Sequence, residues 1–417
     1  MRGKYPTLSL SEKERRWRRT RNLMKHKDLD CLLVFGLKGR ENYDSYLTNL
    51  FFNGIVVFPM GGEPVYLVWS ASRIVRHLEG TLDGEVFWVN DIRLGVSGPS
   101  LVGVLREKGL DQARIGIVGL KTKGPGETEG IVPYTTWSHV LDKFPEANFL
   151  DLSLSFSELM LVKSEEELVL MRYSAEIGEL ACRAMIEATK PGVQETEIYA
   201  TILKTIHSHG AIPSPEGLIL KTGPDNVSWG GNPIWASRGG GSRVLQKGDM
   251  VMAEIFTRYG GLETQQQMAL ALKPVSSLNR YCADVARRSY EAGLSSLRPG
   301  ATFKNVAETM EVPLTEAGCW HLTPLIHSLS PLVWVGPTYV GIDELPGIQN
   351  YKGIRTVPSW GDDLVIKPGM VFELEPNACK DKQRVNIGGT VVVTERGVQE
   401  LNKLPTTMRL IGERPKR

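Results

Sequence analysis

The chain has 417 residues, which is enough for two domains that each bury a core. A formal net charge of +2 and a pI near 8.2 give no electrostatic reason to expect nucleic acid or a membrane as a partner. No apolar stretch has the length of a membrane span, and the N-terminal residues show no secretion signal. Five scattered cysteines without metal-ligand spacing predict reduced thiols and a cytoplasmic protein.

Predicted strands and helices alternate over the first part of the chain, which is typical of an α/β domain. A charged helix over residues 11–27 precedes a buried strand over residues 31–35. Further strands are predicted over residues 54–60, 64–69, 85–89 and 114–118, with helices over residues 70–77, 100–108 and 134–144. We expect this domain to cover residues 1–157.

A second domain is expected over residues 158–417. It begins with apolar residues at helical spacing up to Lys190, after an N-terminal capping pattern at Ser164 and Glu167. A second helix follows over residues 194–209. Two strands around Gly260-Gly261 predict a β-hairpin (residues 250–257 and 262–272), and two more helices are predicted over residues 278–292 and 303–317.

The stretch over residues 365–397 is the most informative part of the chain. It predicts two strands joined by a loop, and the returning strand covers residues 390–394. Glu373 and Glu375 alternate with apolar residues on the first strand, so the two acids share one face. A buried carboxylate is costly unless something pairs with it, so this face is a candidate functional site.

Two segments of this stretch, residues 368–372 (PGMVF) and Glu375-Pro376, resemble the closing strands of the pita-bread superfamily. That superfamily includes methionine aminopeptidase, prolidase, aminopeptidase P and creatinase, and the similarity covers residues 160–400 of this chain. The resemblance implies an α+β protein. A C-terminal pita-bread domain would follow an α/β N-terminal domain of the creatinase type.

The metal ligands of the superfamily are incompletely present. The resemblance places the five ligand positions at Glu254, Gln265, His327, Glu375 and Gly388, so two carboxylates are missing. A two-metal site needs bridging carboxylates, and hard cations prefer several anionic oxygens. We therefore expect no metal and no other cofactor. A single divalent metal held by Glu254, His327 and Glu375 is the less favoured alternative.

Creatinase and ectoine hydrolase resemble the peptidases but cleave a carbon–nitrogen bond without a metal. Residues 326–328 (IHS) resemble the Gly-His-Ser of creatinase, whose His lies in the active site. The general acid/base His of creatinase falls on Gly231, so the chain departs from that pattern too. The resemblance also implies a small-molecule substrate and a homodimer in which residues 43–49 border the partner's site.

The leading interpretation is a metal-independent, creatinase-like hydrolase of a small nitrogen-containing compound. Glu254 and Glu375 would share the acid/base work, and His327 would assist proton transfer. Polar side chains near these residues are candidates for substrate binding: Glu263, Gln265, Gln267, Glu373 and His321. Three alternatives stay open: an Xaa-Pro peptidase-like metalloenzyme with a reduced metal site, a small-molecule lyase, and a binding protein without activity.

Overall fold

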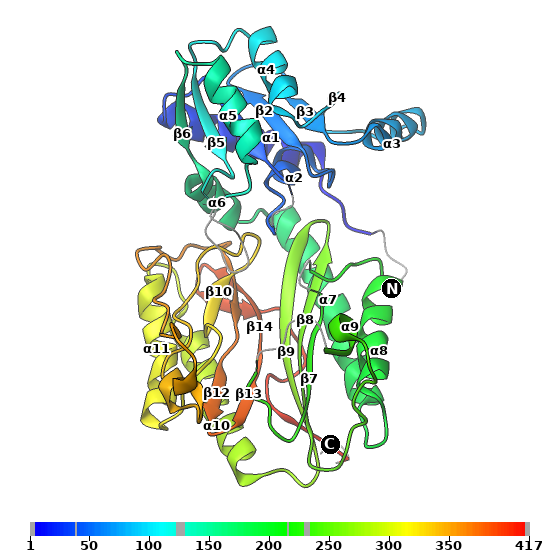
Figure 1. The fold of residues 1–417 in the computed structure, drawn as a ribbon, viewed down its shortest axis with the longest axis vertical. Coiled ribbons are helices and arrows are strands. Elements are labelled where there is room, and N and C mark those ends of the chain that lie inside the picture. Colours follow the sequence, from blue (N-terminus) through cyan, green and yellow to red (C-terminus); the bar gives the residue numbers. More distant parts are fainter. Residues whose placement is uncertain (1–4, 38–39, 122–129, 215–216, 229–233, 413–417) are drawn as a thin grey trace. The chain divides into compact units, whose positions relative to one another are not determined.

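The computed structural model describes residues 5–37, 40–121, 130–214, 217–228 and 234–412. The chain forms two compact units, Met1–Glu166 and Glu167–Arg417, and each is described by itself (Figure 1). Over these described ranges, no helix combines the length and the apolar composition needed to cross a membrane. The domain boundary expected at residues 157–158 falls within helix α6 (Ser153–Leu161) and stays a prediction.

The first unit is built on a mixed six-stranded sheet in the order β4-β3-β2-β1-β5-β6. Its strands are β1 (Cys31–Phe35), β2 (Ile55–Pro59), β3 (Val65–Val68), β4 (Asp91–Leu94), β5 (Arg114–Val118) and β6 (Asn148–Asp151). Its helices are α1 (Leu10–His26), α2 (Tyr43–Thr48), α3 (Ala71–Leu82), α4 (Gly98–Glu107), α5 (Tyr134–Lys143) and α6. The α/β organisation expected for this part of the chain is confirmed.

The apolar run of β1 is explained by burial on both faces of this sheet. Leu32 and Val34 pack into a cluster with residues of α1, α2 and α6. Leu33 and Phe35 point the other way and pack with residues of α4 and α5. β1 pairs with β2 antiparallel and with β5 parallel, so the strand lies between two neighbours as well as two helix layers. A strand in this position has no place for a polar side chain.

The strand expected over residues 85–89 is wrong. The edge strand β4 begins only at Asp91 and pairs in parallel with β3. The preceding residues turn back along α3, where the Phe87 ring centroid lies 4.1 Å from that of His77. The apolar side chains of this segment therefore cover the inner face of a helix instead of joining the sheet.

The second unit contains an eight-stranded sheet whose central path is β10-β11-β14-β9-β8-β7. The strands of the unit are β7 (Ile219–Gly223), β8 (Met250–Tyr259), β9 (Leu262–Leu272), β10 (Ile326–Ser328), β11 (Val371–Leu374), β12 (Asn377–Lys380), β13 (Gln383–Asn386), β14 (Gly388–Thr394), β15 (Gly397–Glu400) and β16 (Arg409–Ile411). The helices are α7 (Glu165–Ala188), α8 (Glu195–Ser208), α9 (Ile234–Arg238), α10 (Ser277–Ser296), α11 (Phe303–Glu316), η1 (Ile342–Glu344) and η2 (Ile348–Asn350).

Two helix pairs, α7 with α8 and α10 with α11, cover one face of this sheet and leave the other face for polar side chains (Figure 1). α7 and α8 pack with alternate residues of β8 such as Ala253, so Glu254 faces the opposite side. On β11, the Phe372 ring lies 6.0 Å from that of Phe303 on α11, so Glu373 also faces away from the helices. We call the side that carries Glu254 and Glu373 the inner face.

The closing stretch holds one more hairpin than the sequence predicted. β11 and β14 confirm the two expected strands, but β12 and β13 pair with each other between them. The expected loop is therefore ordered, with Asn377 opposite Asn386 in the register of this hairpin. Pro376 explains the break between β11 and β12, because a proline cannot donate a ladder hydrogen bond.

Asp44 is a fully buried acid in the first unit. Its Oδ2 accepts hydrogen bonds from Gly54 N at 2.9 Å and from Tyr66 Oη at 2.5 Å. A side chain at Gly36 would collide with the Asp44 carboxyl group, so only glycine fits at that position. Burial raises the pKa of Asp44 from 3.8 to about 6 despite these two donors.

The raised pKa of Asp44 predicts that the first unit loses stability as the pH rises. The folded state binds the Asp44 proton more tightly than the unfolded chain does, so the contribution is present below pH 3.8 and is lost as the pH rises through about 6. A difference of two pKa units corresponds to about 3 kcal/mol. Asp44→Asn should flatten this dependence in denaturant unfolding followed by tryptophan fluorescence at pH 4.5 and pH 7.

The exposed Asp111, whose side chain is 58% accessible, supplies the matched control. Asp111→Asn should leave the pH dependence as in the unchanged protein. An equal change in both variants would show that the Asp44 proton does not carry the effect.

Candidate active site

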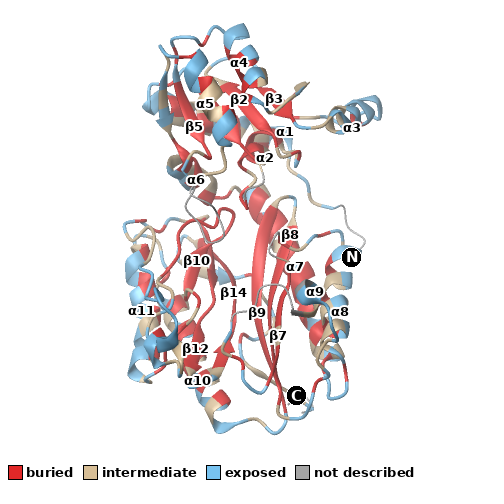
Figure 2. Ribbon diagram, in the orientation of Figure 1, coloured by how far each residue is buried: buried red, intermediate tan, exposed pale blue. Residues whose placement is uncertain are grey.

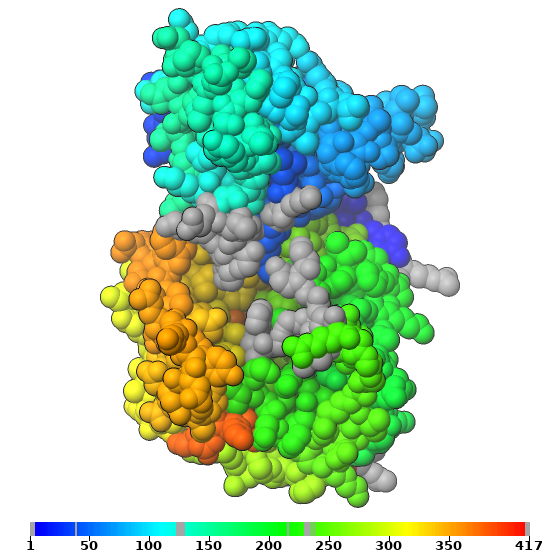
Figure 3. All heavy atoms as spheres, in the orientation of Figure 1, coloured from blue at the N-terminus to red at the C-terminus, as the bar shows by residue number. Residues whose placement is uncertain are grey.

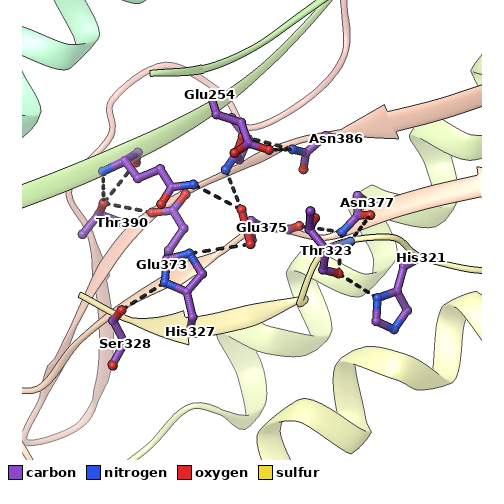
Figure 4. Close-up of polar contacts among 12 residues, drawn as sticks. Glu254, His321, Thr323, His327, Ser328, Glu373, Glu375, Asn377, Asn386 and Thr390 are labelled. Carbon is purple, nitrogen blue, oxygen red and sulfur yellow. Dashed lines mark hydrogen bonds and ion pairs between the residues drawn. The ribbon is translucent and has the colours of Figure 1, made fainter. Parts of the chain in front are cut away.

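Polar side chains from three strands meet on the inner face of the second unit (Figure 4). Glu254 comes from β8, and Gln265 and Gln267 come from β9, where they alternate with residues that face the helices. Glu373 lies on β11 and Glu375 directly follows this strand. All five side chains are buried, so each needs a hydrogen-bond partner or a neutral form.

Glu375 lies at the centre of this network. Its Oε2 accepts hydrogen bonds from Gln267 Nε2 at 2.6 Å and from Gln265 Nε2 at 3.2 Å. Burial raises the pKa of Glu375 well above its usual value, and the negative charge of Glu254 raises it further. Arg384 and the two amide donors act in the opposite direction. This environment therefore favours the protonated form of the Glu375 carboxyl group.

Glu254 occupies the other side of the network. Asn386 Nδ2 donates to Glu254 Oε1 at 2.9 Å and to Gln267 Oε1 at 3.0 Å, so one amide group links the two strands. The Arg384 guanidinium lies 3.6 Å from the same Glu254 oxygen. Glu254 therefore has a guanidinium group beside one of its oxygens, whereas the hydrogen bonds that Glu375 Oε2 accepts come from neutral amides.

His327 lies on β10, directly opposite Glu373 of β11 in the sheet register. Its side chain faces Glu375. Its Nε2 lies 3.6 Å from Glu375 Oε1. Its Nδ1 lies 3.0 Å from the Ser328 carbonyl oxygen, which can only accept a hydrogen bond. In the neutral ring the hydrogen is therefore on Nδ1, and the Nε2 lone pair faces Glu375 Oε1.

Glu373 is the second acid with a strongly raised pKa. Burial is the main cause, and the charge of Glu375 adds to it. Thr390 Oγ1 donates to Glu373 Oε2 at 2.9 Å and also lies 2.8 Å from Gln265 N, so this hydroxyl group joins β11 and β14 to β9. Two neighbouring acids in a dry site do not both ionise, so the pair shares at least one proton.

Two of the predicted binding residues have partners outside this network. Glu263 forms an ion pair with Arg258 at 2.9 Å, two positions from the turn of the β8–β9 hairpin. His321 is fully buried, with Nε2 2.7 Å from Glu311 Oε2 and Nδ1 2.8 Å from Thr323 O. The structure thus brings six of the eight predicted site residues into one network. Glu263, whose charge still acts on Glu373, pairs with Arg258, and His321 pairs with Glu311.

The sequence analysis missed Arg384, Asn386 and Thr390. The first two lie on β13, inside the stretch that was expected to be a loop. Their alternation with Val385 and Ile387 is the signal of a half-buried strand that could have revealed them. Thr390 lies at the start of the predicted returning strand, but nothing local distinguishes its role from that of any β-branched residue.

Three buried oxygen atoms of the network have no hydrogen-bond partner within the part of the chain that the structure describes. They are Gln265 Oε1, Glu373 Oε1 and Asn386 Oδ1. Each belongs to a side chain whose other polar atom is already bound in the network. Buried acceptors of this kind are normally satisfied by water or by a ligand that donates hydrogen bonds.

The residues present do not fit a two-metal centre. A side chain at Gly388 would collide with the Leu374 carbonyl oxygen and would lie only 2.8 Å from Glu375 Cα and 2.9 Å from Gln267 Cγ. The fifth ligand position is thus closed by the backbone. Searching the described ranges finds no group of three His, Cys, Asp or Glu side chains placed to hold a metal ion. Gly231, the position of the creatinase acid/base His, lies outside the described residues.

Comparison with known proteins agrees with this architecture. The model of metallopeptidase family M24 matches residues 169–395. A creatinase from Bacillus sp. (strain B-0618) is 22% identical over 96% of this chain and 92% of that enzyme. An Xaa-Pro dipeptidase from Pyrococcus furiosus is 24% identical over 66% of this chain and 72% of that enzyme.

Solved structures show the same fold. An Xaa-Pro dipeptidase from Bacillus anthracis superposes with a TM-score of 0.70 at 17% identity, covering 95% of this chain and 99% of that one. An X-Pro aminopeptidase from Thermotoga maritima gives a TM-score of 0.72 at 17% identity, with coverage of 95% and 99%. The pita-bread fold with its N-terminal domain, expected from the closing strands, is confirmed.

The close approach at Gly388 predicts that even one methyl group is not tolerated there. Gly388→Ala should lower the free energy of unfolding by about 1–3 kcal/mol, because the backbone atoms that it meets cannot move aside without breaking the β11–β14 pairing. The measurement is the melting temperature from differential scanning calorimetry.

Gly103→Ala in α4 is the control, since a methyl group at this position meets nothing within 4 Å. It should raise the melting temperature slightly, because alanine stabilises a helix relative to glycine. Equal melting temperatures for Gly388→Ala and the unchanged protein would mean that the position has room for a side chain.

Proposed function

Since the chain belongs to metallopeptidase family M24, we propose that it hydrolyses a carbon–nitrogen bond of a small compound without a metal. The observation that carries this proposal is the amide environment of Glu375. Gln265 and Gln267 donate to the carboxyl oxygen that a metal ion would need, at 3.2 and 2.6 Å. The closed position at Gly388 supports the same reading.

The two central acids divide the proton transfers. Glu254, beside Arg384, is the base that removes a proton from the attacking water. The water oxygen bonds to the substrate carbon, and the bond from this carbon to nitrogen breaks. Glu375 supplies the proton that the leaving nitrogen needs, since burial raises its pKa and favours the protonated form.

His327 assists this acid. The lone pair on its Nε2 faces the Glu375 oxygen at 3.6 Å, a separation that a small side-chain rotation reduces to hydrogen-bond length. The Ser328 carbonyl holds the ring in the tautomer that this contact requires. His327 can therefore accept a proton from Glu375 or return one during turnover.

The unsatisfied acceptors indicate the class of substrate. Gln265 Oε1 and Asn386 Oδ1 are amide oxygens that require hydrogen-bond donors, whereas Glu373 Oε1 can accept a hydrogen bond or, when protonated, donate one. A compound rich in N–H groups, such as a guanidino or ureido compound, meets this need better than a carboxylate-rich one. The creatinase relative, which matches 96% of the chain, supports a substrate of this kind. The expected homodimer and the cytoplasmic location stay predictions.

The amide environment predicts that the purified protein binds less than one equivalent of transition metal per chain. Chelators should leave its activity unchanged, because no step needs a metal. Elemental analysis of protein purified without chelator, and assays with and without EDTA, give the answer. Two tightly held ions per chain, or a loss of activity that added metal restores, would favour the Xaa-Pro peptidase alternative.

Glu375→Gln should lower kcat by about 10²–10⁴-fold, because it removes the general acid. Its amide oxygen can still accept from the two glutamines, and its NH₂ group can donate to His327, so folding should be kept. Assays with guanidino, ureido and Xaa-Pro compounds identify the substrate first, and product analysis separates hydrolysis from elimination. The kcat of the Glu375→Gln variant is then measured, and its melting temperature shows whether the variant is folded.

The exposed Glu395 provides the control, and Glu395→Gln should retain full activity. In the unchanged protein, kcat should fall as the pH rises through the raised pKa of Glu375, since the acid then loses its proton. Near-normal turnover by folded Glu375→Gln would remove this residue from the mechanism. Failure of every compound class would favour the binding-protein alternative.

A further inference from the structure

Arg384 is a buried cation beside the candidate active site. Its guanidinium group donates from Nη2 to Thr323 Oγ1 at 3.2 Å and from Nε to Asn377 Oδ1 at 3.4 Å. Nη2 also lies 3.6 Å from Glu254 Oε1, a separation longer than a hydrogen bond. A guanidinium group has five N–H donors and stays charged. Within the described residues, these contacts leave both N–H groups of Arg384 Nη1 for another acceptor.

The β12–β13 hairpin brings Arg384 to the site. Arg384 and Asn386 lie two residues apart on β13, so their side chains share one side of the strand. Both approach the same oxygen, Glu254 Oε1, to which Asn386 Nδ2 donates at 2.9 Å (Figure 4). Figure 2 shows the sheet strands of this unit in the red of buried residues. The hairpin turn at residues 381–382 is exposed, and Figure 3 shows orange-red atoms of the closing stretch at the surface.

Two amide oxygens near this cation have the opposite requirement. Gln265 Oε1 and Asn386 Oδ1 have no hydrogen-bond donor in the described ranges. Asn386 Nδ2 donates to Gln267 Oε1 at 3.0 Å, and Gln265 and Gln267 both donate to Glu375 Oε2, so the two amides belong to one connected network. A ligand that satisfies this network therefore needs one acceptor for Arg384 and N–H groups for the two amide oxygens.

A ureido group has this arrangement of donors and acceptors. Its carbonyl oxygen is an acceptor, and the nitrogen atoms on both sides of the carbonyl can carry N–H groups. A guanidinium group has N–H groups but no acceptor, so it cannot bind the free donors of Arg384, and the two positive charges repel each other. A peptide bond that precedes proline has the carbonyl oxygen but no N–H group.

The charges of the site also favour a neutral substrate. Glu254 and Arg384 carry opposite charges side by side. Burial raises the pKa of Glu373 and of Glu375, which favours the uncharged form of both acids. A cationic substrate would therefore bring an uncompensated charge into a buried site, whereas a ureido group brings none.

We propose that the substrate carries a neutral ureido group whose carbonyl oxygen binds Arg384. This inference rests on the proposed hydrolysis for its chemistry and narrows the substrate class. Attack by water makes the former carbonyl oxygen negative, and Arg384, then a catalytic residue, stabilises this charge. The water proton goes to Glu254. When the carbon–nitrogen bond breaks, the electron pair on the oxygen re-forms the carbonyl, and the leaving nitrogen takes the Glu375 proton. The products are a carbamic acid and an amine or ammonia.

Matched pairs of compounds test the substrate class. N-carbamoylglycine and guanidinoacetate differ only in the group to be cleaved, as do butylurea and butylguanidine. Binding is measured by isothermal titration calorimetry with the full-length Glu375→Gln variant, whose slow turnover leaves the ligand intact. Each ureido compound should bind about tenfold more tightly than its guanidino partner, since one more hydrogen bond is made. Equal or tighter binding of the guanidino compounds or of glycylproline, or no binding of either ureido compound, overturns the proposal.

Arg384→Gln tests the role of the guanidinium. This variant should lower kcat on a ureido substrate by about 10²–10³-fold and lose the preference for ureido over guanidino compounds, which a merely structural defect would not change. Arg384→Lys keeps the charge, so it should still reject guanidino compounds. Arg288→Gln on α10, where the side chain is 43% exposed, is the matched control and should change neither property. Melting temperatures show which variants are folded. An unchanged ureido preference in a folded Arg384→Gln protein would overturn the proposal.

Binding and turnover separate this inference from the proposed function. Ureido binding that Arg384→Gln abolishes, without release of amine or ammonia by the unchanged protein, would support the Arg384 site and contradict the hydrolysis. Cleavage of a ureido compound that Arg384→Gln leaves at full rate would support the hydrolysis and overturn the role of Arg384.

Discussion

The second unit depends on the burial of several carboxyl groups on one face of one sheet. Glu254, Glu373 and Glu375 are all nearly inaccessible to water, and charged carboxylates in such a place are costly. The chain meets this cost in three ways: amide donors from two glutamines, one guanidinium at Arg384, and protonation. The pKa values of Glu373 and Glu375 are raised because their hydrogen bonds offset only part of the cost of burying a charged carboxylate.

The sheet register makes this compensation possible. Gln267 lies opposite Glu254 on β8 and opposite Gly388 on β14, so its amide group binds Glu375 and, through Asn386, is linked to Glu254. The absence of a side chain at Gly388 lets β14 approach Gln267 and Glu375 closely. A carboxylate ligand at this position would separate these groups. The missing ligand and the tight amide contacts are therefore two consequences of one backbone arrangement.

Much of this site could be predicted from local sequence pattern, and the rest depends on contacts between distant segments. Alternation placed Glu373 and Glu375 on one face, and the hairpin around Gly260-Gly261 fixed the direction of Gln265 and Gln267. The same alternation included Glu263, but Arg258 lies directly opposite it in that hairpin and satisfies it. The role of Arg384 required knowing that β13 returns beside β8, which no local pattern reveals.

A site that holds its acids with amides, as we propose for this chain, supports different chemistry from a site that holds metal ions. Metal ions neutralise several carboxylates at once and supply a nucleophilic hydroxide, so the acids around them remain ionised. Amides supply hydrogen bonds but no charge, and the acids must then carry protons to remain buried. In the proposed site, the raised pKa of Glu375 favours its protonated form, and the contact of His327 Nδ1 with the Ser328 carbonyl leaves Nε2 facing this acid. Such a site is therefore suited to protonating a leaving nitrogen, which is the step that carbon–nitrogen cleavage needs most.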